Sequence, residues 1–136
     1  MTQEEKQLLL IDLCARLPYG VKVRNVKMGF DIHNFNHNVR EIKTLIEDFN
    51  IKPYLRPMSS MTEEEQKEFG NLAGLWKDQS TSRFINCLPN LSDEFGKTLI
   101  SEIIVAKAID WLNANHFDYR GLIPMGLALE APEGMY

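Results

Sequence analysis

Apolar residues near the start of the chain recur at the spacing of an α-helix. The stripe, spaced i, i+3, i+4 and i+7, consists of Leu10, Leu13, Cys14 and Leu17. Thr2 and Glu5 precede it and match a capping box, in which each side chain bonds to the backbone N–H of the other residue. Pro18 disfavours helical geometry at the residue before it. The pattern therefore predicts a helix over residues 2–17.

The next segment, VKVRNVKM, alternates between apolar and polar residues as a β-strand does. Its four apolar residues are Val21, Val23, Val26 and Met28. The first two stand at odd positions and the last two at even positions, so a bulge at Arg24–Asn25 would keep all four on the inner face. Residues 29–38, GFDIHNFNHN, are rich in Gly, Asn and Asp and are expected to form a loop or hairpin tip.

Residues 39–49, VREIKTLIEDF, fit two patterns. The helical set is Val39, Ile42, Ile46 and Phe49, whereas every second residue from Arg40 to Ile46 would share one face of a strand. Periodicity slightly favours the helix, and the strand stays open as an alternative. Further on, Pro53 and Pro57 lack an N–H donor, so any strand there is expected to be short or at a sheet edge.

A second capping box, Thr62 to Glu65, opens a pattern that is helical. Its apolar positions are Phe69, Leu72, Ala73 and Trp76, and a longer helical run extends from Ser92 to about Asn115. We therefore expect a single α+β domain over residues 1–136, with a helix at 2–17, a sheet-rich segment at 20–58 and a helical part at 62–136. The sheet is expected to be small, curved and antiparallel, with an SH3-like barrel as one form of it.

Composition points to an ordinary globular protein. No apolar run approaches the roughly 18 residues of a membrane span, and the acidic start lacks the features of a signal peptide, so we expect a cytoplasmic protein without a membrane partner. Cys14 and Cys87 lie far apart and in no CxxC pattern. Neither a disulfide nor a zinc site is expected, and no cofactor is implied.

Charge is distributed unevenly along the chain. Residues 18–58 carry seven Lys and Arg against four Asp and Glu, a net charge of +3, whereas residues 59–136 carry six against twelve, a net of −6. Nucleic-acid binding is therefore an alternative function if the basic side chains of the first segment cluster. The candidate residues are Lys22, Arg24, Lys27, Arg40 and Lys43. The competing interpretation is the solvated outer face of a small sheet.

Asp31, His33 and His37 come nearest to a metal-ligand pattern. Two histidines four residues apart can bind one metal from the same face of a helix, but the intervening Asn34–Asn36 segment disfavours a helix. A polar loop is the favoured interpretation, with a small metal-dependent hydrolase as the corresponding third function. The chain has no nucleophile elbow and no phosphate-binding glycine loop, so we expect no enzymatic activity.

HFDYRG, residues 116–121, gathers side chains that active sites use. A simpler interpretation is a corner between two helices, in which His116 ends one helix and Asp118 caps the following turn. Tyr119 and Arg120 then stay exposed for a partner. Met135 and Tyr136 in the last segment could also dock on a partner or fold back on the core of the chain.

Three blocks of the sequence resemble a family of small proteins of unknown function from gut Bacteroides-type bacteria, their prophages and phages. The blocks are LCARLPYGVKV, IKPYLRPMSSMTEEE and AIDWLNANHFDYRGLIPMGLALEAPEGMY. The resemblance implies a short curved, barrel-like sheet between an N-terminal helix and a helical C-terminal part, with VREIKTLI as a strand. It supplies no catalytic or binding residues.

These observations together favour a non-enzymatic binding or accessory protein of a bacterium or its phage. A protein partner is the first expectation, with Tyr119, Arg120, Met135 and Tyr136 as its contact residues. The sequence does not settle the oligomeric state.

Overall fold

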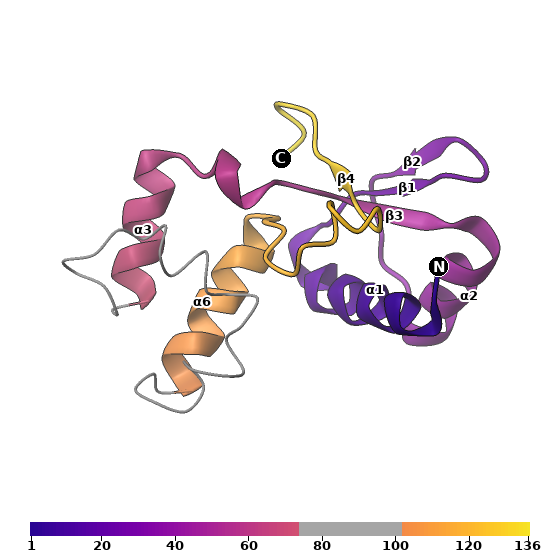
Figure 1. The fold of residues 1–136 in the computed structure, drawn as a ribbon, viewed down its shortest axis with the longest axis horizontal. Coiled ribbons are helices and arrows are strands. Elements are labelled where there is room, and N and C mark those ends of the chain that lie inside the picture. Colours follow the sequence, from indigo (N-terminus) through magenta and orange to yellow (C-terminus); the bar gives the residue numbers. More distant parts are fainter. Residues whose placement is uncertain (74–101) are drawn as a thin grey trace.

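The computed structural model describes residues 1–73 and 102–136 (Figure 1). The helices in these ranges are α1 (Gln3–Arg16), α2 (Val39–Phe49), α3 (Glu63–Ala73) and α6 (Glu102–Ala114). The strands are β1 (Val23–Asn25), β2 (Phe30–Ile32), β3 (Ile51–Leu55) and β4 (Leu129–Glu130), and short 3-10 turns occupy Leu17–Tyr19 and Met58–Ser60. The expected helical positions at Trp76 and Ser92, and the thiol of Cys87, lie outside the described residues.

The strands form one small mixed sheet in the order β2-β1-β3-β4. β1 pairs with β2 and β3 in antiparallel fashion, whereas β3 and β4 run parallel. Within the described part of the chain the sheet stays open, so the α+β class is confirmed but the purely antiparallel sheet and the SH3-like barrel are not.

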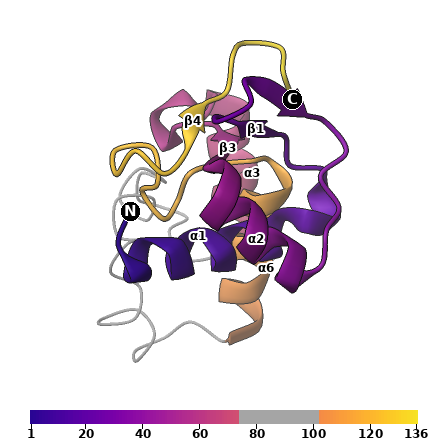
Figure 2. The same ribbon diagram turned by 90° about the vertical axis from the view of Figure 1, so that its right-hand side faces the viewer.

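Two helices, α1 and α2, cover one face of this sheet (Figures 1 and 2). The buried apolar side chains between the layers are Leu9, Leu10, Leu13, Val21, Val23, Ile42, Ile46, Ile51 and Leu55. Cys14 is partly buried against this group, as the sequence predicted for a small apolar residue. Burial also raises the pKa of its thiol. The first core is therefore a helical layer on a sheet.

Residues 39–49 form a helix, so the strand implied by the family resemblance is wrong and the periodicity is correct. Asn38 is the N-cap, and its side chain accepts a hydrogen bond from the Glu41 N–H while Glu41 reaches back to the Asn38 N–H. Ile42 and Ile46, one turn apart, are both buried. A capping box and an apolar stripe on one face fix the helix locally. The Thr2 capping box of α1 is confirmed as well.

The change of phase after Asn25 marks a hairpin turn, and the expected bulge at Arg24–Asn25 is wrong. The Asn25 carbonyl accepts a hydrogen bond from the Gly29 N–H at 2.8 Å, and its side-chain oxygen accepts one from the Met28 N–H at 2.9 Å. The strand therefore ends at Asn25, and Val26 and Met28 are exposed in the turn instead of facing inward. Residues 30–32 of the expected loop return as strand β2.

Pro53 lies in the interior of the sheet, not at its edge. Tyr54 donates its N–H to the carbonyl of Lys22, the residue before β1, at 2.8 Å, and successive N–H groups of a strand point to opposite sides. The nitrogen of Pro53 therefore faces the β4 side. β4 pairs only with Tyr54 and Leu55, so no partner strand requires the missing donor.

A second group of apolar side chains lies between α3 and α6. Its buried members are Met61, Phe69, Ala108, Leu112, Phe117 and Tyr119. The Trp111 ring packs between those of Phe69 and Phe117, with centroid distances of 5.4 and 5.7 Å. The Thr62 capping box at the start of α3 is confirmed by hydrogen bonds of 3.1 Å in both directions with Glu65. Among the described residues, no helix is both long and apolar enough to cross a membrane.

Candidate functional site

The segment after α6 is joined to the end of strand β3 through its backbone. Arg56 donates its N–H to the His116 carbonyl at 2.7 Å and accepts the Asp118 N–H at 2.8 Å, which makes a parallel bridge opposite Phe117. His116 adopts a positive φ of 63°. This left-handed conformation is uncommon for residues other than glycine, and Asn, Asp and His adopt it more often than the rest. It turns the chain sharply, so that Phe117 packs into the apolar group between α3 and α6, which we call the second core.

Asp118 caps the turn that follows, as the sequence predicted. Its two carboxylate oxygens accept hydrogen bonds from the backbone N–H groups of Leu122, at 2.8 Å, and Ile123, at 2.9 Å. These donors would otherwise lack a partner at the start of a turn. The Asp118 carboxylate is thus engaged by its own chain.

A buried ionic network lies beneath this corner and joins it to α1. Arg16 has no exposed surface, and its Nε donates to Asp12 at 2.8 Å while its Nη2 donates to the Phe117 carbonyl at 2.6 Å. The other carboxylate oxygen of Asp12 accepts from Arg120 at 2.7 Å. Sequence reasoning missed this network. Its only local signal is an Asp and an Arg four residues apart within an otherwise apolar helix face.

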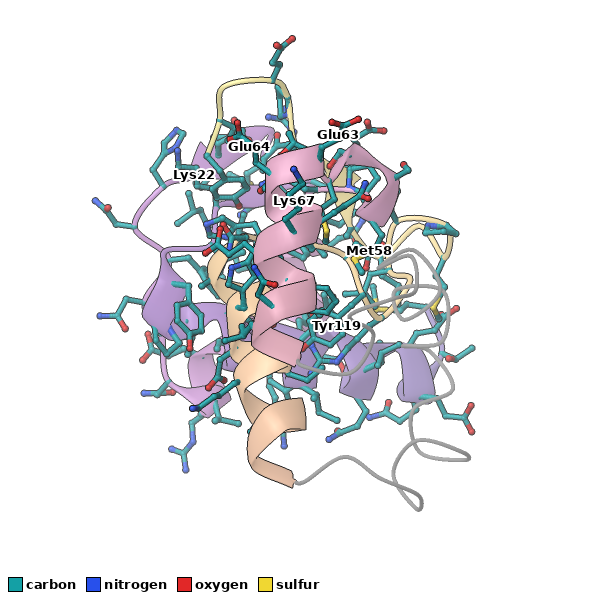
Figure 3. All side chains as sticks on the ribbon, turned by 90° about the vertical axis from the view of Figure 1, so that its left-hand side faces the viewer. Lys22, Met58, Glu63, Glu64, Lys67 and Tyr119 are labelled. Carbon is teal, nitrogen blue, oxygen red and sulfur yellow. The ribbon has the colours of Figure 1, made fainter. Side chains whose placement is uncertain are left out.

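Tyr119 and Arg120 were expected to be an exposed pair, and this expectation is wrong for the tyrosine. Tyr119 is only 8% exposed, lies behind α3 in Figure 3 and donates its hydroxyl to the Asn113 side chain at 3.0 Å. The Arg120 guanidinium lies over the Tyr119 ring, 4.6 Å from its centroid, and binds Asp12. Both side chains therefore make contacts within the chain.

Tyr136 folds back onto the sheet, which was one of the two expected outcomes. Its hydroxyl accepts the Lys22 N–H at 2.9 Å and donates to the Tyr54 carbonyl at 2.8 Å. Its ring stacks on the His116 ring at a centroid distance of 3.5 Å. We call the His116 ring, the Lys22 N–H and the Tyr54 carbonyl the tyrosine slot. Met135 also takes part, because its carbonyl accepts the Lys22 ammonium at 2.6 Å.

Burial and charge act strongly on both rings of this stack. Burial lowers the pKa of His116 to about 4, and the neighbouring cations Arg16, Arg56 and Lys22 act in the same direction. Burial also raises the pKa of the Tyr136 hydroxyl to about 12. Nδ1 of His116 has no hydrogen-bond partner within the described residues. At neutral pH the stack is therefore an uncharged imidazole on an uncharged phenol in positively charged surroundings.

The five basic residues of the nucleic-acid alternative do not converge on one surface. Lys22 and Arg24 lie on sheet strands or beside them, whereas Arg40 and Lys43 lie on α2 in the other layer. Arg24 is held by Asp31 at 3.0 Å, and Lys22 is bound to Met135. Lys27 lies over the Phe49 ring at 5.9 Å. The basic face expected from the sequence is thus divided, and two of its members have internal partners.

Asp31 and His37, two of the three residues of the metal alternative, bind separate partners. Asp31 accepts hydrogen bonds from Tyr54 at 2.8 Å and Arg24 at 3.0 Å, and these bonds lower the pKa of its carboxyl group. His37 pairs with Glu41 at 3.1 Å. In residues 1–73 and 102–136, no three His, Cys, Asp or Glu side chains gather in a way that could hold a metal ion.

One apolar surface remains, and sequence reasoning had assigned its residues to the interior or to a loop. Val26, Met28 and Phe30 are 39%, 60% and 50% exposed, and they stand at alternate positions around the turn between β1 and β2. We call them the apolar hairpin. The hairpin projects at one end of the molecule (Figure 1). β2 is also one of the two edge strands of the sheet.

The depressed pKa of His116 predicts a pH-dependent stability. An unfolded histidine titrates near pH 6.5, so between about pH 6.5 and 4 the unfolded chain binds more protons and the folded chain loses stability as the pH falls. Between pH 7 and pH 5 the free energy of unfolding in urea should fall by about 2 kcal/mol more for the wild type than for His116→Asn. Asn tolerates the positive φ. Equal falls in the two proteins would contradict the assignment.

The buried network predicts a large effect of Asp12→Asn. Without its carboxylate partner, the charge of Arg16 stays in the interior, and the expected cost is about 3–5 kcal/mol of unfolding free energy in urea. Glu47→Gln is the matched control, because it removes the exposed Lys6–Glu47 pair of 2.9 Å and should cost at most about 1 kcal/mol. If both substitutions cost the same, Asp12 does not hold Arg16 as described.

Comparison of the chain with protein-family models, with curated proteins and with solved structures finds no match. The function must therefore be inferred from the surfaces and sites described above.

Proposed function

We propose that the chain is a non-enzymatic protein-binding module whose partner contacts the apolar hairpin. The observation that carries this proposal is the exposure of Val26, Met28 and Phe30 within five residues of one projecting turn. Single exposed apolar residues are ordinary on protein surfaces, but adjacent ones on a protruding element are typical of contact sites. Polar residues can form the turn between β1 and β2 equally well, so the folding of the hairpin does not require these apolar side chains.

The charges around the hairpin support an acidic partner surface. Lys27 stands at the tip, and its ammonium lies over the Phe49 ring without forming an ion pair among the described residues. Lys52, half-buried on strand β3, pairs with no acidic side chain among the described residues. Charges of one sign around an apolar contact favour the approach of the opposite sign. The partner is therefore expected to offer an apolar pocket with acidic residues at its rim.

The family resemblance supports a cellular setting for this role. A binding or accessory protein of a Bacteroides-type bacterium or its phage would meet its partner in the host cytoplasm. Lysate of such a bacterium is accordingly the material in which the proposal is best tested.

A photo-crosslinking residue in place of Met28 should form an adduct with one protein of that lysate. The same residue in place of Met125, which is 46% exposed at a distant turn, is the matched control and should form none. In the Met28 probe protein, Phe30→Ser should reduce the adduct about tenfold, because burial of a large apolar side chain contributes about 1.5–3 kcal/mol. Val39→Ser on α2 should leave the adduct unchanged.

Two results would show that the hairpin is not the contact surface. The first is the same adduct pattern at positions 28 and 125, and the second is no adduct at either position with a correctly folded protein.

A further inference from the structure

The Tyr136 side chain occupies the tyrosine slot as a ligand occupies a binding site. The slot recognises each part of a 4-hydroxyphenyl group: the His116 ring stacks on the aromatic ring at 3.5 Å with an interplanar angle of 13°. The Lys22 N–H and the Tyr54 carbonyl bind the hydroxyl as donor and acceptor. The Lys22 ammonium lies 5.4 Å from the ring centroid, within range of a cation–π contact.

The polar part of the slot is a gap in the β-ladder. Two residues facing each other in a hydrogen-bonded antiparallel pair normally exchange two backbone bonds. Between Lys22 and Tyr54, one of these is direct, from the Tyr54 N–H to the Lys22 carbonyl at 2.8 Å. The second bond, from the Lys22 N–H to the Tyr54 carbonyl, is replaced by the Tyr136 hydroxyl, which accepts from that N–H and donates to that carbonyl. A neutral hydroxyl meets this double requirement, and stacking on the His116 ring favours one that is carried by an aromatic ring.

The slot belongs to the body of the fold, whereas its occupant is on a tether. His116 is buried, and its backbone is fixed by the bridge to Arg56. After β4, by contrast, residues 132–134 are exposed and arch away from the body before the chain returns with Tyr136 (Figures 1 and 2). Withdrawal of Tyr136 and Met135 would therefore open the slot without breaking the first or the second core.

A cleft beside the slot offers space for a longer ligand. Its volume is about 490 Å³, and Tyr136 is part of its wall. The opposite wall includes Arg56, Pro57, Ser60 and Thr62. Glu130 and Glu133 line the cleft from the tethered side. When the tether moves, Glu133 leaves with it and the Lys22 ammonium loses the Met135 carbonyl, whereas Arg16 and Arg56 stay paired with Asp12 and Glu65. The Lys22 ammonium is therefore the cation left to meet an acidic group of the incoming segment.

We propose that the tyrosine slot binds an unmodified tyrosine side chain in an acidic extended segment of another protein, and that Tyr136 is its resident competitor. Tethering gives Tyr136 an effective concentration on the order of millimolar at the slot. An incoming segment must therefore make further contacts in the cleft in order to displace Tyr136. This site is separate from the apolar hairpin, so either proposal can fail without the other. A phosphorylated tyrosine is excluded, because it has no hydroxyl proton to donate to the Tyr54 carbonyl.

The test uses N-acetyl-tyrosinamide as the probe and Tyr136→Ala as the opened protein. We expect the probe to shift the NMR signals of the Lys22 amide and the His116 ring in a saturable manner. N-acetyl-phenylalaninamide should bind at least about tenfold more weakly, because sites that hydrogen-bond a hydroxyl discriminate against analogues that lack it. The wild-type protein should bind the tyrosine probe at least about tenfold more weakly than Tyr136→Ala, because Tyr136 competes.

If the alanine variant does not fold, Tyr136→Phe provides a second test. In this variant the phenyl ring stays on His116 while the hydroxyl contacts are lost. The tyrosine probe should then displace the phenylalanine about tenfold more readily than it displaces Tyr136. Equal binding of the two probes, or no saturable shift at Lys22 in either folded variant, would overturn the proposal.

Discussion

The structure depends on the fully buried guanidinium of Arg16. This side chain leaves α1, takes its counter-charge from Asp12 and donates to the Phe117 carbonyl across a sequence distance of 101 residues. A buried cation is tolerated only where a carboxylate and hydrogen-bond acceptors surround it. Here the acceptors for Nε and Nη2 come from α1 itself and from the corner after α6, while Nη1 has no hydrogen-bond partner among the described residues. The position of that corner relative to the first core is therefore fixed by the requirement to satisfy one charge.

Several features of the corner follow from this constraint. With the Phe117 carbonyl held by Arg16, the Phe117 ring packs on Trp111 in the second core, 5.7 Å between centroids. The backbone on either side of Phe117 pairs with Arg56, the first residue after β3. His116 must then take its left-handed conformation, and this places its ring where Tyr136 stacks. The polar residues of HFDYRG thus hold two cores together and shape one wall of the tyrosine slot.

Local patterns could be predicted from the sequence, because the interactions that cause them span only a few residues. The capping boxes at Thr2 and Thr62 and the Asp118 cap are of this kind, and so is the helical stripe of residues 39–49. The hairpin turn was mistaken for a bulge, because alternation shows which residues share a face but not where a strand ends. Pro53 is tolerated inside the sheet because β4 begins opposite Tyr54 and does not extend back to the proline nitrogen. The bond from Arg16 to Phe117 and the bond from Tyr136 to Tyr54 link residues 101 and 82 positions apart, and no local pattern indicates them.

The central claim is that the corner makes the two cores one cooperative unit. Native-state hydrogen exchange tests this most directly, by comparing the Asp118 N–H at the corner with the Tyr54 N–H in the sheet. The account predicts that both amides exchange only through global unfolding, with the same opening free energy and the same dependence on denaturant. If the Asp118 amide exchanges through a separate opening of lower free energy while the Tyr54 amide stays protected, Arg16 does not couple the two cores.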